Sequence, residues 1–79
     1  MPIMLREDGY RFLFYGADRS EPPHVHVTHS GAEAKFWLEP FVRVAGHKGF
    51  RPHRLAEAEK IVMKHRDHLL EAWHAFFQR

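Results

Sequence analysis

Two histidines, His24 and His26, stand one residue apart in a segment where polar and apolar side chains alternate. On an extended strand, residues two apart point to the same side and lie about 6.5–7 Å apart. The pair therefore predicts a polar site on one face of a sheet. Imidazoles in such a site can transfer protons near neutral pH or bind a metal ion, and the neighbouring side chains decide between these chemistries.

The neighbours follow from a predicted hairpin. His24–His29 and Ala32–Glu39 both alternate, and Ser30-Gly31 between them is typical of a two-residue turn. This register places three pairs on the polar face: His24 with Trp37, His26 with Lys35, and Thr28 with Glu33. It places Val25, Val27, Ala34 and Phe36 on the core face. A shift by one residue would bury the histidines and expose the valines, so the pattern favours this register.

One interpretation is general acid–base chemistry on an anionic substrate. The residues predicted to be catalytic are His24, His26, Lys35 and Arg11. One imidazole can donate a proton while the other accepts one, and the two cations would neutralise charge that develops on a phosphate. Tyr15 and Trp37 offer surfaces on which bases can stack. The set indicates a metal-independent, ribonuclease-like phosphodiesterase.

Two other interpretations stay open. A His-x-His pair can bind zinc if Glu33, Glu39 or His29 supplies a third ligand, which would make the protein a metal-dependent hydrolase. Lys35 opposite His26 would repel a dication, so we assign no metal ligand and no cofactor. The histidines can also be ordinary cross-strand neighbours or contacts to another protein. The protein would then be a non-catalytic interaction module.

The other elements complete an α+β fold. Ile3–Glu7 and Tyr10–Tyr15 flank Asp8-Gly9, which is typical of a type I′ hairpin turn. The register pairs Leu5 with Phe12, Met4 with Leu13 and Ile3 with Phe14. It puts Ile3, Leu5, Phe12 and Phe14 on the core face. Gly16–Pro23 is a predicted loop, Phe41–Ala45 a short further strand, and Gly46–Gly49 a turn.

From residue 53 to 78 the chain contains neither Gly nor Pro, and apolar residues recur at three- and four-residue steps. This predicts one long amphipathic C-terminal helix, continuous or broken in two near Lys64–His65, packed against a small antiparallel sheet of hairpins. We expect a single domain over residues 1–79, with the sheet in 3–45 and the helix in 53–78. The C-terminal aromatics Trp73, Phe76 and Phe77 belong to the core or, where uncovered, to a homodimer or partner contact.

Composition narrows the class of protein. There is no cysteine, no apolar run long enough to span a membrane, and no secretory signal, which predicts a cytoplasmic protein. Residues 1–40 carry four Lys/Arg and six Asp/Glu, whereas residues 41–79 carry eight and four. The basic half suits an anionic partner. Lys48, Arg51 and Arg54, with His47 and His53, surround the predicted helix start and form either a phosphate-binding site or a basic surface loop.

The chain resembles the small bacterial proteins of the domain-of-unknown-function 4160 family over nearly its whole length. The matching segments are Met1-Pro2 with Arg6, Gly9–Phe12, Glu21–Val27, Ala34–Glu39, and Trp73 with Phe76-Phe77. The Pro-His-Val-His-Val block is the most specific of them, and the His-rich connection 46–53 departs from the pattern. The resemblance implies a second small protein encoded alongside, in cassettes that look like toxin–antitoxin pairs, and an RNA or DNA target. It also carries over Arg11, His24, His26 and Lys35.

Overall fold

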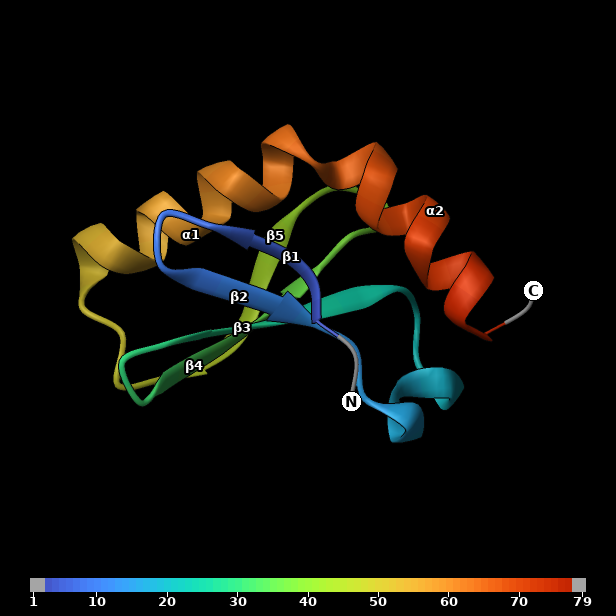
Figure 1. Ribbon diagram of the computed structural model, residues 1–79, viewed down its shortest axis with the longest axis horizontal. Coiled ribbons are helices and arrows are strands. Elements are labelled where there is room, and N and C mark those ends of the chain that lie inside the picture. The colour runs from blue at the N-terminus through green and yellow to red at the C-terminus, as the bar shows by residue number, and fades with distance from the viewer. Residues whose placement is uncertain (1–2, 78–79) are drawn as a thin grey trace.

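The protein is built on a five-stranded antiparallel sheet in which each strand pairs with the next along the chain (Figure 1). The computed structural model describes residues 3–77, apart from the side chain of Ile3. The strands are β1 (Ile3–Glu7), β2 (Tyr10–Leu13), β3 (His24–His29), β4 (Ala32–Trp37) and β5 (Arg43–Lys48). A 3-10 helix, η1 (Gly16–Ser20), lies in the predicted loop between β2 and β3.

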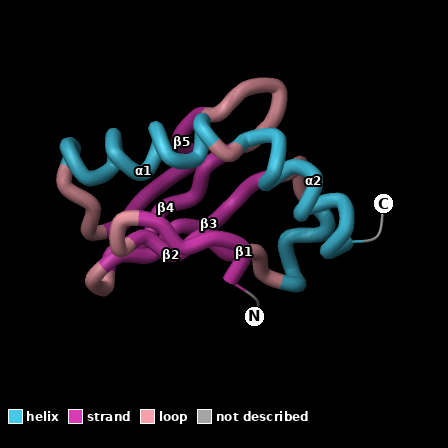
Figure 2. Tube along the Cα trace, turned by 45° about the horizontal axis from the view of Figure 1, so that its top comes forward, coloured by secondary structure: helices cyan, strands magenta, loops and turns pink. Residues whose placement is uncertain are grey.

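Two helices, α1 (Pro52–Lys64) and α2 (Arg66–Phe77), follow the sheet and lie on the same side of it, as Figures 1 and 2 show from two directions. The α+β prediction is confirmed. The helix is interrupted at His65, where φ is −107° and ψ is 16°. This confirms the predicted alternative of a helix broken in two near Lys64–His65. No helix within residues 3–77 is long and apolar enough to cross a membrane.

The hydrophobic core lies between the helices and one face of the sheet. The predicted core residues Phe12, Phe14, Val25, Val27 and Phe36 are all fully buried. The helices pack buried side chains on them, namely Ala58, Ile61, Val62, Leu69, Trp73 and Phe77. Burial of a side chain the size of Val or Phe stabilises the fold by about 1.5–3 kcal/mol. The C-terminal aromatics therefore serve mainly the core, although Phe76 is only half-buried.

The strand registers confirm most of the predicted pairs. All pairs expected between β3 and β4 are present, including His24 with Trp37 and His26 with Lys35. In the first hairpin, Leu5 pairs with Phe12 as predicted, but Ile3 pairs with Leu13 rather than with Phe14. A β-bulge between Ile3 and Leu5 shifts the register there, so the predicted pairs of Met4 and Ile3 are wrong.

The last strand lies further along the chain than predicted. β5 covers Arg43–Lys48, so the predicted strand Phe41–Ala45 starts too early and the predicted turn Gly46–Gly49 is wrong in its first three residues. An irregularity in the pairing at Lys35/Phe36 brings Gly46 opposite Lys35, and pairing with β4 then continues to Lys48. The chain turns at Gly49, where φ is +85°. The sheet therefore extends to residue 48 rather than 45.

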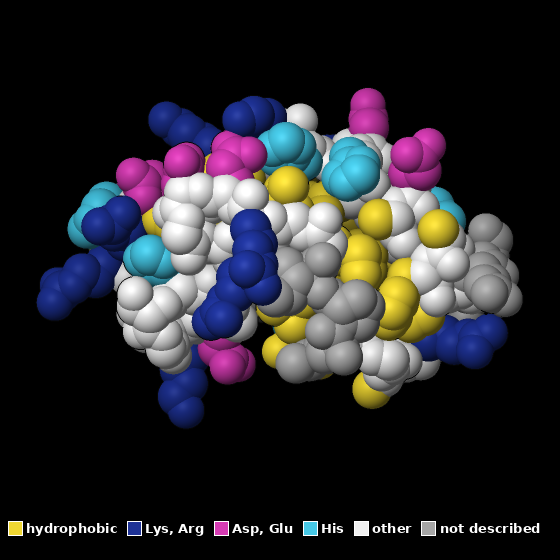
Figure 3. Space-filling view, viewed as in Figure 1, with side chains coloured by type: hydrophobic (Ala, Val, Ile, Leu, Met, Phe, Trp, Pro, Cys, Tyr) yellow, Lys and Arg dark blue, Asp and Glu magenta, His cyan; other side chains and the backbone are white. Residues whose placement is uncertain are grey.

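Glu7 ties the first hairpin to the break between the helices. Its carboxylate accepts hydrogen bonds from Lys64 Nζ and from His65 Nε2, each at 2.8 Å. The bond from Lys64, and then the bond from His65, lowers the pKa of Glu7 below its ordinary value. The helix surface around this contact carries mixed charge, and Asp, Glu and His side chains gather over α1 and α2 in Figure 3.

We expect Glu7→Gln to lower the free energy of unfolding at neutral pH, by an amount that shrinks in acid. A carboxyl with a lowered folded-state pKa stabilises the fold above its unfolded pKa, and this stabilisation is lost as pH falls through the folded pKa. Urea unfolding at several values between about pH 7 and about pH 3 measures the effect. Glu71→Gln, at an exposed position of α2, is the control and should match the wild type throughout. A difference that stays constant down to the lowest pH contradicts the assignment.

Gly49 and Gly31 provide a matched test of the turn geometry. Both have positive φ, +85° and +82°, but a Cβ on Gly49 would lie 3.3 Å from the Cα of Ala32, whereas a Cβ on Gly31 would meet nothing within 4 Å. Alanine in this backbone region costs about 1–2 kcal/mol by itself. We expect Gly31→Ala to cost about that much and Gly49→Ala to cost more. Equal losses in urea unfolding would show that the chain relieves the contact with Ala32.

Candidate functional site

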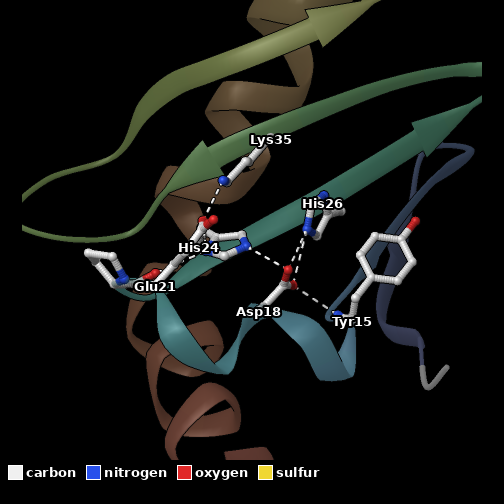
Figure 4. A network of polar contacts seen from close by, with 7 residues as sticks. Tyr15, Asp18, Glu21, His24, His26 and Lys35 are labelled. Atoms are coloured by element: carbon white, nitrogen blue, oxygen red, sulfur yellow. Dashed lines mark hydrogen bonds and ion pairs between the residues drawn. The ribbon is translucent and has the colours of Figure 1, made fainter.

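The side chains on the sheet face away from the helices, here called the outer face, form three rows across the strands. One row runs through all five strands as Arg6, Arg11, Thr28, Glu33 and Lys48. The next contains Leu13, His26, Lys35 and Gly46, and the third contains His24, Trp37 and Arg43. Figure 4 views part of this face, with a helix behind the strands. The structure therefore places all four predicted catalytic residues in these rows.

The outer face carries more cations than carboxylates. Its rows hold five Lys/Arg and one carboxylate, Glu33, and two further carboxylates from the preceding loop lie against it, Asp18 beside His26 and Glu21 paired with Lys35. Arg6 and Arg11 face each other across two strands, both exposed, and neither has an acidic partner among residues 3–77. Like charges directly opposite each other are unfavourable unless an anion lies between them or nearby. This pair therefore presents two like charges at the surface of the outer face.

Trp37 stands beside an open groove at the edge of the outer face. The groove has a volume of about 600 Å³ and is lined by Pro22, Trp37, Glu39, Pro40, Arg43 and Arg66. Lys35 Nζ lies 4.6 Å from the centre of the Trp37 ring, and the Arg43 guanidinium carbon lies 6.0 Å from it. Arg66 is held in place by donating from Nε to the carbonyl of Leu38 at 2.8 Å. The groove thus combines a half-buried indole with two guanidinium groups and one carboxylate, Glu39, and Lys35 lies over the indole beside it.

The predicted histidine pair is centred on a carboxylate that the sequence reasoning missed. Asp18 of η1 lies between the two rings (Figure 4), with His26 Nε2 3.1 Å from Oδ2 and His24 Nε2 3.1 Å from Oδ1. Asp18 Oδ2 also accepts the backbone N–H of Tyr15 at 2.9 Å, which fixes the carboxylate at the start of η1. The ligand atoms of these three side chains all lie within 4.8 Å of one another, so the group could hold a metal ion.

His24 is not on an open surface, contrary to the prediction for this face. Its side chain is fully buried, because η1 covers it from one side and the rings of Trp37 and Trp73 lie 5.5 and 5.1 Å from it. His24 Nδ1 donates to the carbonyl oxygen of Pro22 at 2.9 Å. His24 Nε2 has no hydrogen-bond partner in the described part of the chain, although the Asp18 carboxylate is close to it.

The surroundings shift the pKa values of two members. Burial is the largest influence on Asp18 and acts to raise its pKa, but the Tyr15 N–H and the imidazoles of His26 and His24 outweigh it, so the net shift is downward. The pKa of His26 is lowered, because burial outweighs the hydrogen bond to Asp18. These directions favour an ionised carboxylate beside a neutral His26 imidazole at neutral pH.

Other predicted residues have different neighbours from those expected. Lys35 Nζ is 2.5 Å from the Glu21 carboxylate, and this bond is the main reason that the pKa of Glu21 is lowered. Tyr15 packs its ring against His26, with ring centres 4.4 Å apart, rather than presenting a free stacking surface. Arg11 shares the outer face with these groups but makes no hydrogen bond or ion pair within residues 3–77.

The basic cluster predicted at the helix start is divided by the structure. Lys48 lies on the outer face, whereas Arg51 and Arg54 border a small hollow of about 180 Å³ next to His29 and Phe50. Arg54 also pairs with Glu57 at 3.2 Å. Of the third metal ligands proposed from the sequence, His29 bonds the Gly9 carbonyl and Glu39 lines the Trp37 groove, whereas Glu33 borders a hollow of about 240 Å³ that His26 also lines.

The comparisons with known proteins identify a family and no function. A family model described as "Domain of unknown function (DUF4160)" matches residues 9–74, which is most of the chain. No curated protein and no solved structure matches. The match includes the whole of η1, the His-x-His strand and Lys35, so the polar site lies within the residues that the family model matches. The chain belongs to the DUF4160 family.

Proposed function

We propose that the protein binds single-stranded nucleic acid across its outer face, with the Trp37 groove receiving a base. The observation that carries the proposal is the charge of that face, where the three rows hold five Lys/Arg and one Glu, and Lys35 alone of these five is paired with a carboxylate within residues 3–77. Neutralisation of phosphates by Lys and Arg supplies most of the affinity in sequence-independent binding. α1 and α2 lie on the opposite side of the sheet (Figure 2), and apart from His24, which η1 covers, the outer face keeps exposed side chains such as Arg11 and Lys48.

The groove supports a single strand rather than a duplex. An unstacked base can lie against an aromatic side chain, and each such contact contributes about 1–3 kcal/mol. Trp37 offers this surface beside Arg43 and Arg66, so one base and its neighbouring phosphates would meet an indole and two guanidinium groups. Bases in a duplex are already stacked and paired, so they could not enter.

The geometry favours binding over the metal-independent cleavage that the histidine pair suggests from sequence. Acid–base catalysis needs two imidazoles that can reach the substrate. His24 is fully buried, and both rings face the Asp18 carboxylate, which would repel a phosphodiester. A toxin–antitoxin role, a partner protein encoded alongside and a homodimer stay predictions. Growth of a culture after induction of the protein, beside a variant that lacks outer-face cations, tests the first of these.

Binding of a fluorescently labelled single-stranded RNA, followed by anisotropy, tests the proposal. Lys48→Ala removes one outer-face cation, and Lys60→Ala removes one from the exposed surface of α1. We expect Lys48→Ala and Arg11→Ala to weaken binding and each to reduce the slope of log K against log salt by about 0.7. Lys60→Ala should leave both unchanged, although it changes the net charge equally. Equal effects of Lys48→Ala and Lys60→Ala would contradict a defined face.

Trp37→Ala tests the groove separately. We expect the substitution to weaken binding of the same RNA by about 1–3 kcal/mol, because it removes a stacking contact. The slope of log K against log salt should stay the same, because no charge is removed. A single-stranded DNA of the same sequence shows whether the 2′-hydroxyl contributes, and a duplex should compete poorly. Unchanged affinity in Trp37→Ala, with its fold verified by circular dichroism, would remove the groove from the site.

A further inference from the structure

The buried nitrogen of His24 has a geometry that calls for a cation. A carbonyl oxygen can only accept hydrogen bonds, so the contact with Pro22 at 2.9 Å fixes the proton of His24 on Nδ1. In the neutral ring, Nε2 is then a bare lone pair. It points toward Asp18 Oδ1 at 3.1 Å, in a fully buried position, and no donor within residues 3–77 reaches it. A positive centre must therefore lie between these two atoms, either a second proton on His24 or a metal ion, and His26 Nε2 beside the same carboxylate supplies the third ligand that a metal ion would use.

We propose that Asp18, His24 and His26 bind one divalent transition-metal ion, with Zn²⁺ as the representative ion. The inference is independent of nucleic-acid binding. Ligands about 2.0–2.1 Å from a tetrahedral zinc ion are about 3.3 Å from one another. Asp18 Oδ1 lies 3.1 Å from His24 Nε2 and 3.2 Å from His26 Nε2, which is close to this value, and the three ligand atoms lie within 4.8 Å of one another, so small side-chain rotations complete the set.

The groups around the three ligands are those that orient metal-binding side chains. A metal-bound histidine usually donates its other N–H to a backbone carbonyl or a carboxylate, as His24 Nδ1 does to Pro22. The Asp18 carboxylate is fixed by the Tyr15 N–H. Pro22 and Pro23 restrict the backbone that carries the accepting carbonyl, since proline fixes φ. The ligands are therefore positioned before an ion arrives.

The charge around the site also suits a dication. Lys35, which from sequence alone argues against a metal, is paired with Glu21 at 2.5 Å, so its charge is offset. Glu21 Oε1 lies 3.7 Å from His24 Nδ1 and adds a second carboxylate near the site. Asp18 and His26 keep 12% and 21% of their side chains exposed, which gives an ion an entrance from the outer face. Three protein ligands leave a coordination position for water or a ligand.

Calorimetric titration of the metal-free, untagged protein with Zn²⁺ tests the site. We expect one ion per chain, with affinity reduced more than about tenfold in Asp18→Asn and in His26→Ala. Asp18→Asn is the sharper variant, because the amide can donate to the bare His24 Nε2 and its oxygen can still accept from Tyr15. It should fold as well as the wild type while losing zinc. His74→Ala, at an exposed position of α2, controls for binding by surface histidines and should titrate as the wild type does.

Nitrogen-detected NMR of the imidazoles keeps the test valid if a variant fails to fold. On addition of Zn²⁺ to the wild type, we expect the Nε2 resonances of His24 and His26 to shift, and those of the exposed His53, His68 and His74 to stay unchanged. Shifts confined to the exposed histidines, or zinc affinity equal in the wild type and Asp18→Asn, would overturn the proposal. So would a loss in His74→Ala as large as that in His26→Ala. Neither measurement contains nucleic acid, so the result does not depend on the proposed function.

Discussion

The covering of only one face of the sheet is the constraint on which the rest of the structure depends. Successive strand residues point to opposite faces, so once α1 and α2 lie on one side, each position is assigned either to the core or to the outer face. Val25 and Val27 are fully buried under the helices, and His24 and His26 between and beside them must then point the other way. The polar site is therefore a direct consequence of the core, not an addition to it.

The same constraint explains which parts of the fold the sequence predicts. In β3 and β4 every second residue is strongly apolar, so a shifted register would bury Lys35 and expose Phe36, and the predicted pairing is confirmed throughout. In β1, Met4 is acceptable on either face. The alternation therefore carries no information about the β-bulge there, and the predicted register fails at that point.

β5 shows a second limit, because the local residue preferences and the sheet pairing disagree. Gly46-His47-Lys48-Gly49 has the composition of a turn, yet the first three residues pair with β4 and only Gly49 turns. At this sheet edge β5 is mostly exposed, so it lacks the buried alternation that identifies β3 and β4. Pairing with β4 makes residues 46–48 a strand, and the preferences of the single residues do not predict this pairing.

Asp18 lay outside the sequence prediction for a related reason. Asp18 is six and eight residues before the histidines that it contacts, and it lies in the connection between two strands. No periodic sequence pattern predicts the conformation of such a connection. The local signal is modest, since Asp18 accepts the N–H of Tyr15 three residues earlier, which is the contact that the third residue of a helix makes in a capping box. Sequence reasoning sought the third ligand on the strands, at Glu33, Glu39 and His29, because only strand residues have predictable directions.

The two proposals are linked by electrostatics, and the link has a definite sign. Asp18 places a negative charge within a face that is otherwise basic, beside His26 and near Lys35. A dication bound there would change the local charge from about −1 to about +1 and remove the repulsion between Asp18 and a phosphodiester. Thermodynamic linkage then requires that metal strengthens nucleic-acid binding and that nucleic acid strengthens metal binding by the same factor. An absence of this coupling would indicate that the nucleic acid binds away from His26, closer to Trp37 and Arg43.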